Sequence, residues 1–430
     1  MRSPGGFMAL KMQAGHAVTL GRILLLGVFV TMLVSTSVSI AFEFASYLAF
    51  ALVPELRRRF VGILTHPLAI ALLPFALILV VATLYGPASW RDALGALFGW
   101  RRILLLPLAL AVFDDGASKR MLLKVALVTC MVGTLASLFT AAAGIPLTRG
   151  PGIIFHNYAT QGMTLSIGIV ICVAALLRQD AYAGDALLGR RWILVAAIAL
   201  MVLDIVFVLP GRSGYVSVLV MGAAITALLA KGSWRVKAAA AAAVLLCLAA
   251  VLALSESGRG RIAQAVQEIA TVDQAAEGTS LGVRVVMWRN TVRMVRDHPI
   301  FGVGTGGFQD GYRPYVQGVS GWHGHETGDP HNQFLKILGE QGLVGLAALL
   351  FFIVGVFRCP GADPYRQIAI ALLLGWCATS LANSHFSTFV EGRLLFFWLG
   401  ALLAGWPGPN RASLDNDTFP AHAHRASTAG

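Results

Sequence analysis

The chain has 430 residues, of which 57% are hydrophobic and only 13% are charged, and its mean hydropathy is +0.73. Soluble domains carry about 25% charged residues, so this composition excludes an ordinary water-soluble fold and indicates membrane spans. The formal net charge is +12. The Lys and Arg residues lie in short clusters between apolar runs. The positive charge is therefore better explained by the usual excess of basic residues in cytoplasmic loops than by nucleic-acid binding.

Runs of about twenty apolar residues predict about twelve transmembrane helices and therefore an all-α polytopic membrane protein. The first run is followed by Ser35, Thr36 and Ser37 and then by a second long run. We therefore expect a retained first span rather than a cleavable signal. The predicted spans lie near 18–35, 37–54, 66–86, 100–114, 118–143, 158–178, 191–209, 212–230, 235–255, 332–357, 365–385 and 390–406.

Basic residues cluster after every second predicted span, and these loops are expected to be cytoplasmic. Both termini then face the cytoplasm, and residues 407–430 are expected to form a disordered tail. The chain divides into spans one to nine (1–255), a long polar loop (256–331) and spans ten to twelve (332–406). The basic clusters are Arg57, Arg58 and Arg59; Lys119 and Arg120; Arg178, Arg190 and Arg191; Lys231, Arg235 and Lys237; and Arg358 with Arg366.

The polar loop 256–331 is expected on the periplasmic side. It contains seven Arg, eight acidic residues and no Lys, so its charge nearly balances. Long external loops with mixed charge usually carry function. We see no internal repeat in the sequence, which weakens the interpretation of an inverted-repeat transporter.

Residues 282–297, GVRVVMWRNTVRMVRD, predict an amphipathic helix. At about 100° per residue, one face carries three arginines that are expected in solvent or at lipid headgroups. Arg284 and Trp288 lie on the opposite face, which should pack inward. A buried arginine needs an anionic partner, and that partner is either a structural carboxylate or a bound phosphate. The three arginines of the outer face are Arg289, Arg293 and Arg296.

A glycine-rich run, Phe301 to Phe308, follows this helix. Its backbone N–H groups form either a phosphate-binding nest or an ordinary tight turn.

The last segment of the loop, Asp329-Pro330-His331-Asn332, precedes predicted span ten. Asp329 fits the N-cap and Pro330 the first helical position, so we expect His331 in the first turn of the helix. The positive potential there favours a neutral imidazole, which a general base needs. The alternative is a histidine that only forms a hydrogen bond in that turn.

Two further places on the same side carry candidate residues. Arg212 lies at the start of span eight, on the predicted periplasmic side, where the positive-inside bias makes arginine unusual. We therefore expect its side chain either to bind a group at a functional site or to reach the outer lipid headgroups. Before span six, His156, Tyr158 and Gln161 form either a cradle for a sugar or an interfacial belt.

Neither the cysteines nor the carboxylates of the loop predict a metal site. The five cysteines lie within or beside apolar runs and contain no CxxC pair, so they predict neither zinc nor disulfides. Asp310, Glu326 and Asp329 could in principle hold a cation, but their spacing matches no metal loop, and we expect them to be solvated. His323 and His325 are likewise expected to be polar loop residues rather than metal ligands.

Taken together, these motifs resemble the O-antigen ligase family. The resemblance rests on Arg212-Ser213-Gly214, on Arg284 and Trp288 before His298-Pro299 and the glycine run, and on His331-Asn332. The latter pair is followed by Leu335, Glu340, Gly342 and Gly345. The motifs cover roughly residues 205–350.

The resemblance implies a GT-C-like inverting glycosyltransferase of the bacterial inner membrane that needs no metal or other cofactor. Its implied substrates are O-antigen linked to undecaprenyl diphosphate and lipid A–core oligosaccharide, besides membrane lipids. It also implies that Arg212, Arg284 and His331 are the essential positions. The candidate substrate-binding residues are Asn332, Trp288, His156, Tyr158 and Gln161.

The residues agree with this chemistry. Two arginines can neutralise a leaving diphosphate, and a histidine can deprotonate the acceptor hydroxyl. Three alternatives remain open: an O-antigen polymerase, a protein O-oligosaccharyltransferase and a transporter of lipid-linked sugars. A transporter would need charged residues or broken helices near mid-membrane. The clear acidic residues inside apolar runs are Asp204 and Glu43, and two carboxylates at different depths do not form a relay.

Overall fold

The computed structural model describes residues 4–147, 150–254, 256–271 and 278–405, and within them the chain forms helices and no β-strand. The tail predicted at 407–430 lies outside the described residues. Along the chain the helices are α1 (Pro4–Met32), α2 (Thr36–Leu52), α3 (Pro54–Ile63), α4 (Pro67–Val81), α5 (Trp90–Gly99), η1 (Trp100–Leu104), α6 (Leu105–Val112), α7 (Gly116–Ala143), α8 (Tyr158–Leu177), η2 (Gln179–Tyr182), α9 (Arg191–Leu203), η3 (Asp204–Val208), α10 (Arg212–Leu229), α11 (Trp234–Leu254), α12 (Glu256–Ala270), α13 (Ser280–Asp297), α14 (Phe308–Tyr312), η4 (Arg313–Tyr315), η5 (Gly321–Gly324), α15 (Gln333–Arg358), α16 (Tyr365–Thr379) and α17 (Phe389–Leu403).

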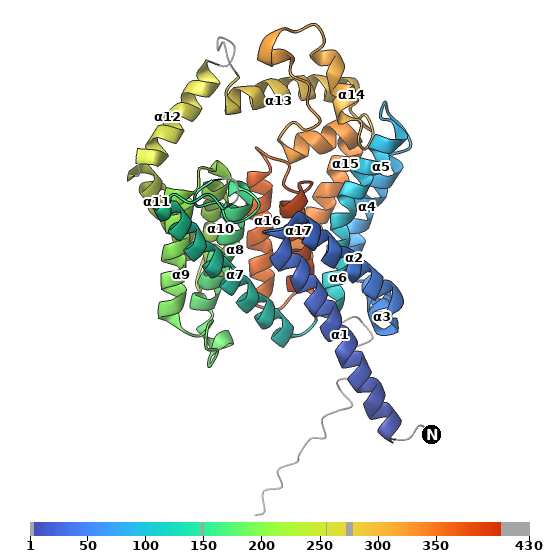
Figure 1. The fold of residues 1–430 in the computed structure, drawn as a ribbon, viewed down its shortest axis with the longest axis vertical. Helices are drawn as coiled ribbons and strands as arrows, with labels where there is room; N and C mark the ends of the chain where they lie inside the picture. The colour runs from blue at the N-terminus through green and yellow to red at the C-terminus, as the bar shows by residue number, and fades with distance from the viewer. Residues whose placement is uncertain (1–3, 148–149, 255, 272–277, 406–430) are drawn as a thin grey trace, which may run out of the picture.

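This architecture confirms an all-α polytopic membrane protein (Figure 1). Each predicted span coincides with a helix, although the number twelve stays a prediction. Among the described residues, seven helices are long and apolar enough to cross a membrane, or up to eight if one bent pair is a single span. Helices such as α16 and α17 have only 15 residues and are shorter than a full span of about 20.

Parts of the predicted layout were wrong. Arg57, Arg58 and Arg59 do not form a loop but lie in α3, which is bent by 93° relative to α2. Pro54 explains the bend, because a proline starts a new helix readily but cannot continue the preceding one. Predicted span 365–385 ends early, at Thr379.

The basic clusters lie at one end of the helical bundle, which we call the basic end. Their side chains bind the ends of neighbouring helices there, which agrees with the predicted placement of these clusters on one side. The contacts are Arg59 with Asp114 at 2.9 Å, Arg178 with the Leu229 carbonyl at 3.0 Å and with Asp363 at 3.2 Å, and Lys119 with the Ala404 carbonyl at 2.8 Å.

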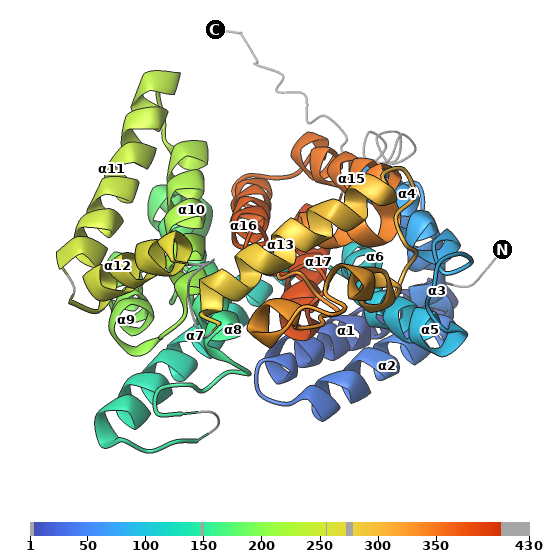
Figure 2. The same ribbon diagram turned by 90° about the horizontal axis from the view of Figure 1, so that it is seen from above.

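Helices α12, α13 and α14 lie together at the opposite end, above the long helices in Figure 1, and α13 crosses the end of the bundle when seen from above in Figure 2. The predicted faces of α13 are confirmed. Thr291 is buried and Arg284 and Trp288 are half-buried, whereas the three arginines of the outer face are exposed. Thr279 caps the helix by accepting a hydrogen bond from the Gly282 N–H.

The glycine-rich run after α13 packs against α4 and α15, and its N–H groups are used within the protein. The Val303 and Gly304 N–H groups donate to the Gly339 and Glu340 carbonyls at 2.9 and 2.8 Å, and the Thr305 N–H donates to the Ala82 carbonyl. Of the two sequence interpretations, these contacts support the turn and leave these amides unable to bind a phosphate.

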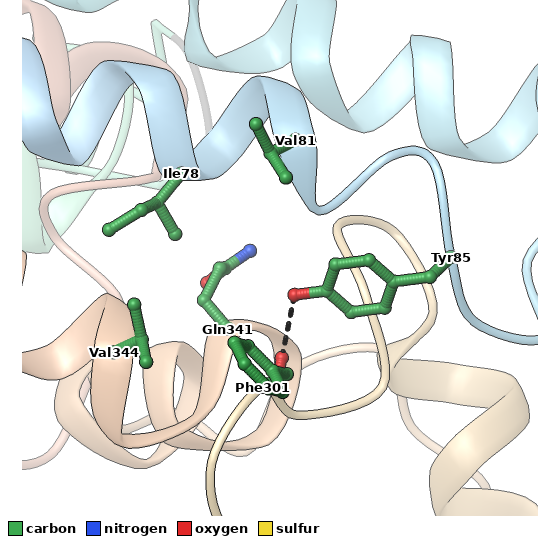
Figure 3. Close-up of a pocket in the computed structure, with 6 residues that line it drawn as sticks. All are labelled: Ile78, Val81, Tyr85, Phe301, Gln341 and Val344. Atoms are coloured by element: carbon green, nitrogen blue, oxygen red, sulfur yellow. Dashed lines mark hydrogen bonds between the residues drawn. The ribbon is translucent and has the colours of Figure 1, made fainter.

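The start of the glycine-rich run and the residues just before it lie against a break in helix α15. Gly342 has φ +64° and ψ −161°, which interrupts the helix, and the Pro299 and Ile300 carbonyls accept hydrogen bonds from the Leu343 and Val344 N–H groups there. Beside this break is an apolar cavity of about 340 Å³ (Figure 3), where the Tyr85 hydroxyl donates to the Phe301 carbonyl at 2.8 Å. The signature glycine Gly342 therefore has a structural reason: only glycine adopts this conformation easily.

Gly304→Ala is expected to destabilise the protein by at least about 2 kcal/mol. Gly304 has φ +85°, and a Cβ there would lie 2.1 Å from the Tyr85 carbonyl oxygen. The matched control is Gly95→Ala, because Gly95 lies within helix α5 with open space around it. Thermal unfolding in detergent should show a clearly lower Tm for Gly304→Ala and an unchanged or higher Tm for Gly95→Ala. Equal Tm values would contradict the tight packing of the run.

Candidate active site

The start of several helices surrounds a cavity of about 810 Å³, which we call the polar cavity. Its lining includes the first residues of α8, α10, α13 and α17, and the segment that leads into α15. Helix N-termini carry partial positive charge and free N–H donors, so their convergence favours an anionic ligand. In the described part of the chain no side chain caps α10 or α17, whereas Asn157, Thr279 and Asn332 cap the other three.

Arg212 enters the polar cavity from the first turn of α10. The following residues of the motif fix its place. Gly214 and Gly162 together allow α10 to cross α8 closely. A Cβ on Gly162 would lie 2.7 Å from the Gly214 Cα, and a Cβ on Gly214 would lie 3.3 Å from the Gly162 Cα. The Ser213 hydroxyl accepts a hydrogen bond from the Asn383 amide at 3.1 Å. Arg-Ser-Gly is therefore a positioning motif as well as a source of charge.

Arg284 enters the same cavity from the inward face of α13. Its guanidinium forms no hydrogen bond or ion pair with any described residue. Burial lowers the pKa of Arg284 and the positive charge of Arg212 acts in the same direction, while Tyr158 and Glu268 oppose this effect. Two arginines thus face one cavity, and their mutual repulsion would be relieved by a bound anion.

Glu268 of α12 lies beside this pair and acts electrostatically on both arginines. It lies 3.8 Å from the Arg212 guanidinium and accepts a hydrogen bond from the Leu281 N–H at 3.0 Å, at the start of α13. A separation of 3.8 Å between charged atoms is longer than a close hydrogen bond. Glu268 therefore balances part of the charge on Arg212 without saturating its donors.

His331 also lines the polar cavity, but its predicted place in the helix was wrong. The N-cap of α15 is Asn332, not Asp329, and the helix begins at Gln333. His331 precedes the cap with φ +51°, in the left-handed region that non-glycine residues rarely adopt. Asp329 is unavailable as a cap, because its carboxylate is bound elsewhere.

Asp329 holds the segment that carries His331. Its carboxylate accepts hydrogen bonds from the His331 N–H at 2.7 Å and the Ser384 hydroxyl at 2.6 Å, and pairs with Lys336 at 2.9 Å. Burial acts against its ionisation, yet Lys336 and these hydrogen bonds keep the pKa of Asp329 below its usual range. This network compensates for the strained backbone at His331, as strained residues at functional sites require.

The surroundings of His331 favour the neutral form of its imidazole. Partial removal from solvent lowers its pKa, Asp329 opposes this effect, and Arg284 and Lys336 lower the pKa further. The predicted neutral imidazole is therefore supported. The cause of the lowered pKa differs from the expected one. It comes from desolvation and from neighbouring positive charges, because His331 does not lie in the first turn of the helix.

The structure brings five of the eight candidate residues together at the polar cavity: Arg212, Arg284, His331, His156 and Tyr158. His156 lies against Phe389 of α17, with ring centroids 6.3 Å apart. Tyr158 is exposed at the start of α8.

The other three candidates bind backbone instead. The Trp288 indole donates to the Pro330 carbonyl at 2.8 Å, next to His331. The Asn332 side chain caps α15 and donates to the Leu381 carbonyl at 2.9 Å. Gln161 is fully buried, and its amide accepts from the Ile154 N–H at 2.8 Å. These contacts give them structural roles around the site, and Trp288 in particular positions the segment before His331.

The sequence interpretation missed the segment from Ser380 to Thr388, between α16 and α17, which also lines the polar cavity. It brings His385 to the cavity, and the following helix brings Glu391. A signal was present in the sequence. The polar run Asn383-Ser384-His385 falls at the end of an apolar stretch, and Glu391 is an acidic residue inside a predicted span.

Asp310 and Glu326, the other two loop carboxylates considered as cation ligands, are paired with arginine. Arg313 contacts Asp310 at 3.0 Å and Glu326 at 3.2 Å, and all three side chains remain partly exposed to solvent. Among the residues that the structure describes, no group of three or more His, Cys, Asp or Glu side chains is arranged to hold a metal ion.

Comparison with known proteins supports the resemblance drawn from the motifs. Residues 196–350 match the family model described as O-antigen ligase, and this range contains Arg212, Arg284 and His331. A stretch of 89 residues is 35% identical to an uncharacterized protein of Haemophilus influenzae, covering 20% of this chain and 22% of that protein. The chain thus spans about a fifth of this curated relative. The family match supports a multi-pass membrane enzyme of the glycosyltransferase-like ligases and polymerases that act on lipid-linked glycans.

Proposed function

We propose that the protein is an O-antigen ligase. It transfers O-antigen polysaccharide from undecaprenyl diphosphate to lipid A–core oligosaccharide, with inversion and without a metal ion. The observation that carries the proposal is the pair Arg212 and Arg284, which face His331 across one cavity where helix N-termini converge. A diphosphate is the anion that such a cluster suits best.

In the proposed reaction, His331 removes the proton from the acceptor hydroxyl. The hydroxyl oxygen attacks the anomeric carbon from the side opposite the diphosphate, and the new C–O bond forms as the old one breaks. Undecaprenyl diphosphate leaves with the bonding electron pair, and Arg212 and Arg284 neutralise its growing charge. The uncapped N-terminus of α10 adds donors beside Arg212.

The helix directions favour a site at the periplasmic face of the bacterial inner membrane. α8 and α10 begin at the polar cavity, and they end where Arg178 binds the Leu229 carbonyl at the basic end. The positive-inside rule makes the basic end cytoplasmic. Residues 256–331 then form a periplasmic helical domain over the membrane part formed by 1–255 and 332–406, as in a GT-C-like enzyme.

The acidic residues expected for a transporter have structural partners. Glu43 is paired with the buried Arg393 at 2.6 Å, and Asp204 accepts a hydrogen bond from the Gln161 amide at 3.3 Å. Neither contributes to the polar cavity. The cavity instead concentrates its charged groups at one end of the bundle, as a transferase of lipid-borne substrates requires.

The purified protein is expected to transfer glycan in the presence of EDTA. It would be offered undecaprenyl-diphosphate-linked glycan and lipid A–core in liposomes, and the products separated by gel electrophoresis. A ladder of glycan-modified lipid A–core is the expected result, because arginines replace a metal ion at the diphosphate.

The alternative outcomes are distinct. Longer lipid-linked chains from donor alone would contradict the ligase and indicate an O-antigen polymerase. Glycan on a protein acceptor would indicate a protein O-oligosaccharyltransferase. Donor that crosses the bilayer without any transfer would indicate a transporter. Loss of the ladder on adding EDTA would overturn metal independence.

A further inference from the structure

His385 is a buried histidine of the polar cavity that the proposed chemistry does not use. Its side chain is 3% exposed and lines the cavity. Within the part of the chain that the structure describes, neither ring nitrogen has a hydrogen-bond partner. A buried polar group without a partner is costly, so it normally indicates a binding or catalytic role.

The backbone on both sides of His385 is held firmly. The Gln333 amide oxygen accepts hydrogen bonds from the Phe386 and Ser387 N–H groups, each at 3.1 Å. Arg102, itself buried, donates to the Ser387 and Thr388 carbonyls, and Ser384 binds Asp329. The segment therefore fixes the ring in place while its nitrogens stay unpaired, as a preorganised ligand contact requires.

Glu391 decides which ligand group suits His385. It is 4% exposed, lines the same cavity, and accepts a hydrogen bond from the Thr160 hydroxyl at 2.6 Å. A phosphate beside this carboxylate would be repelled. A sugar hydroxyl would instead donate to an imidazole nitrogen or the carboxylate and accept from the imidazole N–H.

The lining of the polar cavity thus contains two chemically different sets of side chains, which we call its two walls. Arg212 and Arg284 come from α10 and α13, whereas His385 and Glu391 come from the segment before α17 and from α17 itself. We propose that His385 and Glu391 form a subsite for a sugar hydroxyl of the transferred glycan or of the acceptor oligosaccharide. This inference rests on the proposed function, because it assumes that the arginine wall takes a diphosphate carried by one of the sugars.

His385→Phe is the sharpest test, because it keeps a flat ring and removes both unpaired nitrogens. In the absence of ligand it should fold with an unchanged or higher Tm, since an apolar ring needs no partner in that place. Affinity would be measured for the full-length protein in nanodiscs with three probes: undecaprenyl-diphosphate-linked glycan, sugar-free undecaprenyl diphosphate, and lipid A–core. His298→Phe is the control, because His298 is exposed and outside the cavity lining.

We expect about tenfold weaker binding of one sugar-bearing probe, as the loss of one good hydrogen bond implies, and unchanged binding of sugar-free undecaprenyl diphosphate. Weaker binding of the glycan-linked lipid would place the contacted sugar hydroxyl on the donor. Weaker binding of lipid A–core would place it on the acceptor. His385→Gln, which keeps a donor and an acceptor, should restore part of the affinity. It also serves as the test variant if the phenylalanine protein does not fold.

Two results would overturn the subsite alone. One is equal weakening for the sugar-free lipid, which would make His385 a diphosphate contact. The other is unchanged binding of all three probes by the folded variant. If kcat falls while binding is unchanged, His385 acts in proton transfer and not in binding a sugar hydroxyl. If the wild-type protein binds none of the probes, the proposed function fails and this inference with it.

Discussion

Replacing Arg284 with glutamine should lower kcat/KM for glycan transfer by about a hundredfold or more, which is the usual cost of removing one charged donor from a developing anion. The reason is geometric. Arg284 is half-buried on the inward face of α13, and among the described residues it has no partner that satisfies its guanidinium. A bound diphosphate would supply that partner through two parallel hydrogen bonds.

Arg284→Lys separates charge from shape, because lysine keeps the charge and loses the two-pronged donor geometry. We expect only partial recovery relative to the glutamine variant. Arg293→Lys and Arg293→Gln are matched controls on the same helix, since Arg293 is exposed on the opposite face. Full activity of Arg284→Lys at normal expression and Tm would contradict the proposed diphosphate clamp. A loss in the Arg293 variants as large as in the Arg284 variants would show that the effect comes from α13 and not from the site.

The local features of the fold were predictable because their causes are local. The two faces of α13 follow from helical periodicity alone, and the separation of Arg284 from the exposed arginines is what the sequence implies. Apolar runs likewise predicted the position of each long helix. The bend before α3 was missed because an apolar run gives no measure of direction, although Pro54 marks the place.

The start of α15 could not be predicted from local sequence preferences. Asp329 and Asn332 are both good N-cap residues, and propensity alone does not decide between them. The choice is made by tertiary contacts: Lys336 and Ser384 bind the Asp329 carboxylate, which leaves Asn332 to cap the helix. His331 is consequently moved out of the helix into a strained conformation, and no sequence pattern signals this.

The second wall of the polar cavity depends on contacts between distant parts of the chain. Glu391 meets Thr160, which is 231 positions away in the sequence, and Arg102 reaches the Ser387 carbonyl across 285 positions. Polar residues near the end of a predicted span are equally compatible with an interfacial loop. Only the packing of α8, α16 and α17 shows that His385 and Glu391 face the same space as the arginines.

Replacing His331 with alanine should lower kcat by about a hundredfold to ten-thousandfold, the range that a general base contributes. Binding of the undecaprenyl-diphosphate-linked donor should change little, because Arg212 and Arg284 remain. The control is His325→Ala, since His325 is exposed and outside the lining of the polar cavity. Donor affinity and single-turnover transfer measured on the same preparation separate the two effects. If donor binding is lost together with transfer, His331 binds substrate and does not act as the base.

The pH dependence of transfer gives an independent test of the same assignment. An imidazolium cannot accept a proton, so transfer through His331 is lost as the pH falls through the pKa of that residue. Desolvation and the charge of Arg284 hold this pKa below the ordinary histidine value of about 6.5 in the free enzyme. The acid limb of the kcat/KM profile, which reports the free enzyme, should therefore lie below that pH. The residual activity of His331→Ala should lack this limb, whereas His325→Ala should retain it. An acid limb that persists unchanged in His331→Ala would assign the proton transfer to another group. His385 would then be the first to examine, because it is a buried histidine in the lining of the same cavity.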